Sequence, residues 1–203
     1  MLVYMLRIAK AALPPGINPP ADAVCCETVL ELVERFRTRC KSEPFVLLTY
    51  GIDAEIVEHI RFCFPDGFYV EPGCNIDEEL KRIQSVVIPL RPEFHVRCDR
   101  IRYIECRSRK LLFYYPEYVR TTNYPVKKLP DLSGYGIFRC HGSFYVNFQY
   151  VDAATPDDFR MMGGGIAPIS RQYNHVYRYY KELGRTASRP DTELTQRNTH
   201  RRS

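Results

Sequence analysis

The chain has 203 residues, of which 45% are hydrophobic, enough for one ordinary domain that buries its own core. Its 29 Lys and Arg residues exceed its 24 Asp and Glu residues, which gives a formal net charge of +5 at pH 7. The longest uncharged apolar run, near Pro44, has about nine residues, whereas a bilayer span needs roughly twenty. The sequence therefore predicts no membrane partner.

The first residues are apolar, but Arg7 and Lys10 fall within the apolar stretch instead of before it. A secretory signal has the opposite order of charge and apolar core. We therefore expect an intracellular protein, cytoplasmic or nuclear. Its eight cysteines are expected to be mostly reduced thiols, because disulfides are rare in that environment.

The first half alternates between helical and strand patterns. Residues 1–13 predict a strand or a short helix, the proline-rich residues 14–22 an extended linker, and the periodicity of residues 23–40 an amphipathic helix. Further strands are expected at 45–50, 68–70 and 85–90, with helices between them that begin at Asp53 and at Asn75 or Asp77. This alternation is typical of a small α/β layer.

After Pro92 the apolar residues alternate with polar ones, which predicts an antiparallel β-meander. Residues 155–162 have the pattern of a capped helix ended by three glycines, and residues 169–183 predict a last helix that stops at Gly184. The fold class is therefore α+β: a helix-rich α/β N-terminal half packed on an antiparallel β-meander, with a C-terminal helix. We expect a single domain over residues 1–184 and a disordered basic tail over 185–203.

Positive charge is concentrated in one stretch. Between Arg91 and Lys128, ten basic residues face four acidic ones, an excess larger than that of the whole chain. Phosphates require cations and unstacked bases require flat rings, so basic residues among tyrosines suit a nucleic acid or an acidic protein surface. The candidate binding residues are Arg97, Arg100, Arg102, Arg107, Arg109 and Lys110, with Tyr103, Tyr114 and Tyr115.

An ordinary solvated sheet face explains the same residues equally well. Successive side chains of a strand point to opposite faces, so whether these cations share a surface depends on the strand register. The sequence leaves that register open.

Two groups of residues have ligand types that suit zinc. One group is His95, Cys98, Cys106, Cys140 and His141, and the other is His59, Cys63 and Cys74. The chain contains no CxxC pair, and structural zinc sites usually have two closely spaced ligand pairs. We therefore expect no cofactor and interpret the cysteines as free thiols.

An enzymatic alternative is a metal-dependent nuclease that uses Asp66 and Glu105. Such enzymes hold a divalent ion between two carboxylates and use a lysine to activate water. Here Arg107 occupies the lysine position, and arginine keeps its proton at working pH. The preferred prediction is a non-enzymatic regulatory or accessory protein that binds a nucleic acid or protein partner, with no small-molecule substrate evident.

Overall fold

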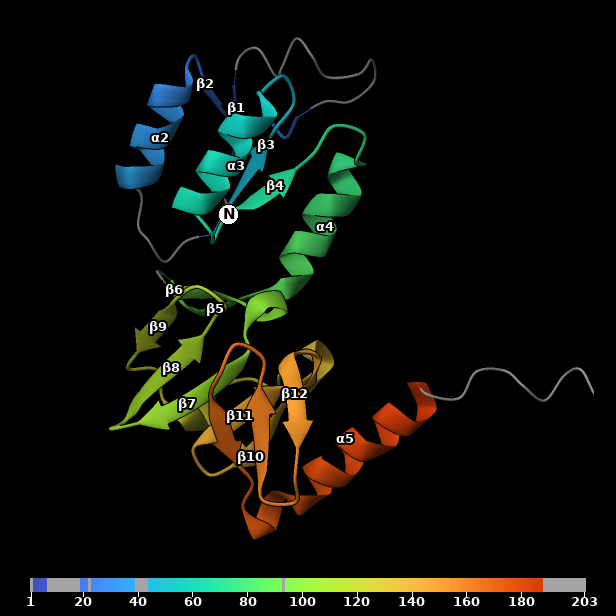
Figure 1. Cartoon of the computed structure of the whole chain (residues 1–203). Helices are drawn as coiled ribbons and strands as arrows, with labels where there is room; N and C mark the ends of the chain where they lie inside the picture. Colours follow the sequence, from blue (N-terminus) through green and yellow to red (C-terminus); the bar gives the residue numbers. More distant parts are fainter. Residues whose placement is uncertain (1, 7–18, 22, 39–43, 93, 188–203) are drawn as a thin grey trace, which may run out of the picture. The chain divides into compact units, whose positions relative to one another are not determined.

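The computed structural model describes residues 2–6, 19–21, 23–38, 44–92 and 94–187 (Figure 1). The chain divides into two compact units, Met1–Arg100 and Ile101–Ser203. Both helices and antiparallel sheets are present, so the fold class is α+β, as the sequence predicts. Among the helices of the described ranges, none is long and apolar enough to span a membrane.

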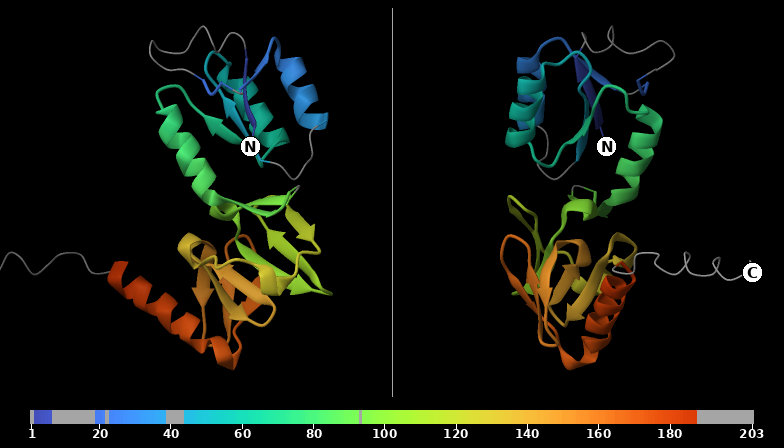
Figure 2. Two further views of the ribbon diagram at one scale, coloured as in Figure 1. Left: turned by 180° about the vertical axis from the view of Figure 1, so that it is seen from behind. Right: turned by 45° about the vertical axis from the view of Figure 1, so that its right-hand side comes forward.

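The first unit contains a four-stranded parallel sheet in the order β2-β1-β3-β4. Its strands are β1 (Leu2–Leu6), β2 (Val24–Cys26), β3 (Phe45–Leu48) and β4 (Phe68–Val70). Its helices are α2 (Val29–Thr38), α3 (Ala54–Cys63) and α4 (Ile76–Val86). Helices α2 and α3 lie on one face of the sheet and α4 on the other (Figure 2). Burial on both faces explains why β3 is apolar at every position.

The sequence prediction needs correction at two places in this unit. The predicted helix over 23–40 is a strand, β2, followed by the shorter helix α2, because residues Val24–Cys26 pair with β1. The strand predicted at 85–90 exists as β5 (Val87–Arg91), but it pairs with β6 (Phe94–Arg97) and not with the parallel sheet. The break in alternation near Asp99 is the short 3-10 helix η1 (Cys98–Arg100).

The second unit contains a five-stranded antiparallel sheet in the order β10-β11-β7-β8-β9 and a three-stranded sheet in the order β12-β13-β14. The strands of the larger sheet are β7 (Tyr103–Arg107), β8 (Lys110–Tyr114), β9 (Val119–Thr122), β10 (Ile137–His141) and β11 (Phe144–Asn147). The smaller sheet has β12 (Val151–Ala154), β13 (Asp158–Met161) and β14 (Ile166–Pro168). The 3-10 helices are η2 (Val126–Lys128), η3 (Ser133–Tyr135), η4 (Phe148–Tyr150) and η5 (Arg171–Tyr173), and the last element is α5 (Asn174–Ala187).

A separate hydrophobic core fills this unit. It joins side chains of both sheets to helix α5 through Val146, Phe159 and Val176, each of which is buried. The rings of Phe148 and Tyr180 meet edge to face at 5.1 Å. Because each unit has its own core, the single domain predicted over 1–184 divides in two.

Two local predictions in the second unit are wrong. Residues 155–162 form a turn and strand β13, because Asp158–Met161 pair with β12 and β14, and the Thr155 hydroxyl accepts the backbone N–H groups of Asp157 and Asp158 within the turn. Helix α5 runs through Gly184 to Ala187 instead of ending at residue 183. The predicted linker 14–22, apart from residues 19–21, and the predicted tail beyond residue 187 lie outside the described residues.

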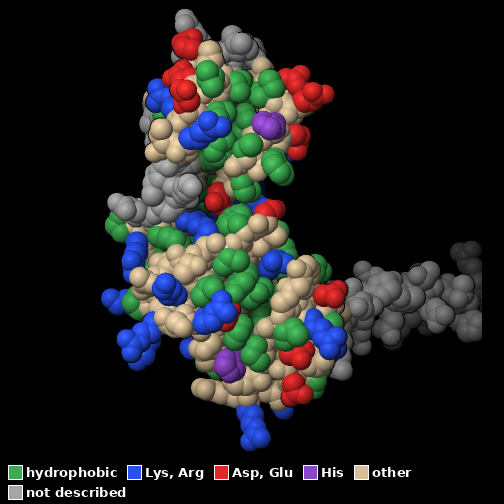
Figure 3. Space-filling view, turned by 60° about the vertical axis from the view of Figure 1, so that its left-hand side comes forward, with side chains coloured by type: hydrophobic (Ala, Val, Ile, Leu, Met, Phe, Trp, Pro, Cys, Tyr) green, Lys and Arg blue, Asp and Glu red, His purple; other side chains and the backbone are tan. Residues whose placement is uncertain are grey.

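Charge is divided unequally between the two units. The first contains twelve Lys and Arg against fifteen Asp and Glu, and the second contains seventeen against nine. On the face drawn in Figure 3, Lys and Arg side chains are prominent over the second unit and Asp and Glu side chains over the first. The positive charge of the chain therefore belongs to the second unit.

Three consecutive glycines, Gly163–Gly165, connect β13 to β14, and all three have positive φ angles. A Cβ atom at Gly165 would lie 2.9 Å from the hydroxyl oxygen of Tyr103, whereas one at Gly164 would meet no atom within 4 Å. Both positions favour glycine because of their positive φ angles. Of the two, only Gly165 also leaves no room for a Cβ atom.

We expect Gly165→Ala to destabilise the second unit by about 3 kcal/mol and Gly164→Ala by about 1 kcal/mol. Both variants strain the backbone at a positive φ angle, and Gly165→Ala also brings a Cβ atom against Tyr103. Urea unfolding of the two variants measures the difference. Equal losses would show that Tyr103 moves aside without cost.

Candidate nucleic-acid interface

Strands β7 and β8 form a hairpin whose tip is positively charged. Arg107 pairs with Lys110, so Ser108 and Arg109 alone form the turn. Their φ angles are 51° and 64°, and two positive φ angles in succession define a type I′ turn, which favours Asn-Gly. The side chains of Arg107, Arg109 and Lys110 are exposed. The register that the sequence left open therefore brings three of the predicted cations to one tip.

The other three predicted cations make contacts within the protein. The guanidinium of Arg97 lies 3.7 Å from the ring centroid of Phe68 and donates to the Asp99 carboxylate at 2.8 Å. Arg100 donates to a backbone carbonyl in the turn before β4, and Arg102 to the carbonyl before the glycine turn at 2.7 Å. The six candidate cations therefore divide into two groups, because three guanidinium groups donate to backbone carbonyls or a carboxylate of the protein while the other three are exposed at the hairpin tip.

The three predicted tyrosines do not form an open stacking platform. Tyr103 and Tyr115 are buried, and the rings of Tyr103 and Tyr114 stack on each other at 4.0 Å. The Tyr114 hydroxyl donates to the Glu105 carboxylate at 2.7 Å. Burial, followed by this hydrogen bond, raises the pKa of Tyr114 to about 12. Buried rings cannot stack on bases, and the partly buried ring of Tyr114 packs against Tyr103, so these tyrosines support the hairpin.

The β10–β11 turn, His141–Ser143, lies beside the hairpin. The backbone N–H of Cys106 in β7 donates to the Ser143 carbonyl at 2.7 Å. On the other side of β10, the N–H of Ser170 donates to the Cys140 carbonyl at 3.1 Å. The residues that lead into η5 and α5 therefore contact the same end of the sheet. Three connections that are far apart in the sequence therefore converge.

Arg139 fixes this arrangement. It donates to the carbonyls of Gly142 at 2.8 Å and His141 at 3.3 Å. Its guanidinium also lies 5.5 Å from the ring centroids of Tyr145 and Tyr173. These contacts join the β10–β11 turn to the residues that precede helix α5.

The converging end carries much more positive than negative charge. Its cations are Arg107, Arg109 and Lys110 at the hairpin tip and Arg139 at the β10–β11 turn, and Glu105 is an acidic side chain on the same strand as Arg107. The Glu105 carboxylate is only 17% exposed, accepts the Tyr114 hydroxyl and lies 3.6 Å from the Nε atom of Arg107. Arg139 is not among the predicted binding residues, because only the fold brings its strand to the β10–β11 turn beside β7.

The family comparison concerns the same segment. Residues 93–180 match the LytTr DNA-binding domain. The match covers less than half of the 203 residues and supports a nucleic-acid-binding function for this part of the chain. It contains the whole described sheet structure of the second unit, together with β6 and η1.

Among solved structures, the chain is similar to the LytTr DNA-binding domain of a protein described as a methyl-accepting/DNA response regulator from Bacillus cereus. The identity is 25% and the TM-score is 0.39, over 47% of this chain and 96% of that domain. The chain matches none of the curated proteins.

The predicted zinc groups do not assemble into complete sites. Within the described ranges, no group of three or more His, Cys, Asp or Glu side chains is placed to hold a metal ion. Cys98 and Cys140 are buried free thiols. His59 and Cys63 do come together, with 3.8 Å between Nε2 and Sγ, but Cys74 does not complete the group.

The nuclease alternative gains no support. Asp66 belongs to the first unit and Glu105 to the LytTr-matched segment of the second. The Glu105 carboxylate accepts the Tyr114 hydroxyl and lies near Arg107, so it stabilises the hairpin through these two contacts.

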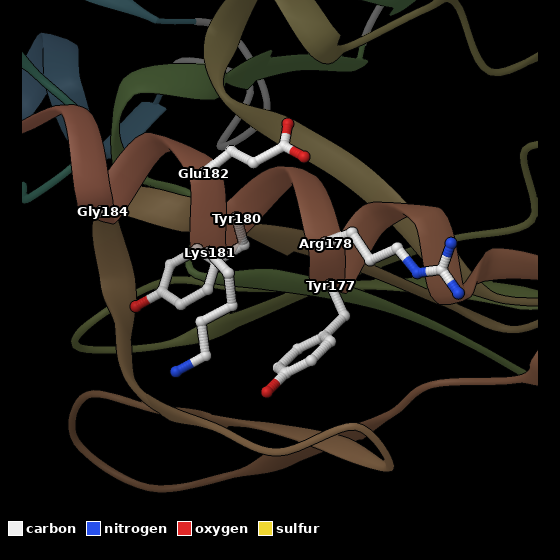
Figure 4. A pocket seen from close by; sticks show the side chains of 6 residues that line it. All are labelled: Tyr177, Arg178, Tyr180, Lys181, Glu182 and Gly184. Atoms are coloured by element: carbon white, nitrogen blue, oxygen red, sulfur yellow. The ribbon is translucent and has the colours of Figure 1, made fainter.

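Helix α5 borders a pocket of about 620 Å³ near the end of the LytTr-matched segment. Its lining residues are Tyr177, Arg178, Tyr180, Lys181, Glu182 and Gly184 (Figure 4). Tyr177, Tyr180 and Lys181 point to one side of the helix and Glu182 to the other (Figure 4). The Nζ atom of Lys181 lies 5.8 Å from the ring centroid of Tyr177.

We expect Cys98 and Cys140 to resist alkylation in the folded protein, while Cys25 and Cys63 react. Burial raises the pKa of Cys98 and of Cys140 to about 12, and the thiolate is the reactive form, whereas Cys25 and Cys63 are exposed. Mass spectrometry after brief iodoacetamide treatment at pH 8 identifies the labelled positions. Labelling of Cys98 or Cys140 as fast as Cys25 would contradict their burial.

Proposed function

We propose that the protein is a non-enzymatic regulator that binds DNA through its second unit, with the β7–β8 hairpin tip as the main contact. The observation that carries the proposal is the two-residue turn that brings Arg107, Arg109 and Lys110 together at the exposed tip of the hairpin. The family match over residues 93–180 supports the choice of DNA as the partner.

The shape of the hairpin suits a DNA groove. Paired strands lie about 4.8 Å apart, and the major groove, about 12 Å wide, admits a two-stranded ribbon. A two-residue turn keeps the tip narrow, so its cations can approach phosphates or base edges. Arg139 of β10 donates to the carbonyls of the β10–β11 turn, which is bonded to β7, and adds a further cation on this side of the hairpin.

The backbone of the tip also favours a functional role. Arg109 has a φ of 64°, a conformation in which glycine is unstrained and a long side chain is not. Strain of this kind, about 1 kcal/mol or more, persists where the side chain has another use. A cation retained at a glycine position is therefore consistent with selection for charge at the tip.

We expect the double variant Arg107→Ala/Arg109→Ala to weaken binding to a mixed-sequence DNA duplex. It should reduce the slope of log affinity against log salt by about two, since each phosphate contact contributes about 0.9. Arg160 is an exposed cation on β13 of the same unit, so Arg160→Ala is a matched control that should change neither quantity. Fluorescence anisotropy over a range of salt concentrations measures both.

Two outcomes would contradict the proposal. One is an unchanged salt slope in the double variant, and the other is an equal loss in Arg160→Ala, which would indicate general attraction to the whole unit. If the protein binds an acidic polypeptide but not DNA, the partner is a protein and not DNA.

The single variant Arg109→Gly separates stability from binding. Glycine relieves the positive φ, so the free energy of unfolding should rise by about 1 kcal/mol, while DNA affinity falls because a cation is lost. Thermal unfolding and anisotropy measure the two effects on one sample. A variant that gains stability and binds DNA as tightly as the parent would show that Arg109 makes no contact.

A further inference from the structure

Helix α3 of the first unit presents two metal-ligating side chains on its exposed surface. His59 and Cys63 are one helical turn apart, both are exposed, and their Nε2 and Sγ atoms are 3.8 Å apart. With Zn–N near 2.0 Å and Zn–S near 2.3 Å, two ligands of a tetrahedral zinc ion lie about 3.6 Å apart. The pair is therefore already close to the spacing that one zinc ion requires.

The helix holds this pair rigidly. The Asp53 carboxylate accepts the N–H of Glu55 at 2.9 Å and caps the start of α3. Val57 and Ile60 are buried in the unit, with exposed fractions of 7% and 2%. These buried side chains anchor the inner face of the helix, and His59 and Cys63 lie on the exposed part of the helix beside it.

Apolar side chains flank the pair on the same outer surface. Phe62 is 86% exposed and Ile56 is 38% exposed. At 100° per residue, both lie within about one third of the helix circumference that also contains His59 and Cys63. Large exposed apolar side chains beside a polar site are typical of a surface that another chain covers.

We propose that His59 and Cys63 form half of a zinc site, which a second copy of this chain completes through the same two residues. Structural zinc sites are almost always four-coordinate, and no third His, Cys, Asp or Glu of the described ranges joins the pair. A second copy related by two-fold symmetry supplies one more His and one more Cys, which completes a Cys₂His₂ set.

The same contact covers Phe62 and Ile56, because a two-fold contact places identical surfaces against each other. The excess of acidic residues in the first unit, with Glu55 one turn before His59, favours a cation there. The inference does not depend on the proposed DNA-binding function, because its residues belong to the other unit.

The test uses the full chain in a phosphine reductant, titrated with zinc chloride. Light scattering after size exclusion and native mass spectrometry should show a change from one chain to two, with one zinc ion for each pair of chains. Cobalt(II) in place of zinc should give the visible absorption of a tetrahedral ion and a thiolate-to-cobalt charge-transfer band.

Cys63→Ser and His59→Asn should each weaken zinc-dependent pairing at least tenfold. Cys25→Ser and His175→Asn replace an exposed cysteine and an exposed histidine elsewhere and should leave pairing unchanged. Circular dichroism confirms that each variant is folded.

Several results would overturn the inference. They are one zinc ion bound per single chain, pairing that persists in Cys63→Ser, and a metal-free dimer that disappears with reductant, which would identify a disulfide instead. An unpaired, metal-free chain at a zinc concentration tenfold above that of the protein would also overturn it.

Discussion

The register of β7 against β8 is the constraint on which the second unit depends. Because Arg107 pairs with Lys110, the turn has room for only two residues, and both must adopt positive φ. The same register places Tyr103 opposite Tyr114, so their rings stack and the Tyr114 hydroxyl reaches Glu105. A shift of one residue would exchange the faces of every side chain in the hairpin, burying cations and exposing rings.

The arginines of the basic stretch have two different roles. Those near the start of the stretch, such as Arg97, donate to carbonyls or carboxylates inside the protein and stabilise turns. Those at the hairpin tip extend into solvent. A guanidinium group has five donors in a fixed fork, so it satisfies buried carbonyls as readily as it binds phosphate. Composition alone cannot separate the two roles.

Much of the fold could be predicted from the sequence, because several segments carry strong local signals. The buried strand at 45–48 is apolar throughout, Asp53 and Asn75 cap their helices, and the break near Asp99 marks η1. The errors arose where distant contacts decided the outcome. Val24–Cys26 became a strand by pairing with β1, and Asp158–Met161 became β13 by pairing with β12 and β14, although Thr155 has the local pattern of a helix start.

The candidate site was predictable only in part, for a related reason. The concentration of charge drew attention to Arg107, Arg109 and Lys110, but their common location followed from the strand register. Arg139 belongs to a distant segment, and only the hydrogen bonds that join the β10–β11 turn to Arg139 and to β7 bring it towards the hairpin. Likewise, the four-residue spacing of His59 and Cys63 was visible, while their exposure was not.

The unequal division of charge between the two units also affects how the protein approaches a partner. Its pI of about 8.7 is an average over an acidic unit and a strongly basic one, so the chain behaves as an electric dipole. Near a polyanion, the second unit is attracted while the first is repelled. Diffusional encounters are then oriented before any short-range contact forms, and this orientation weakens as added salt shortens the Debye length.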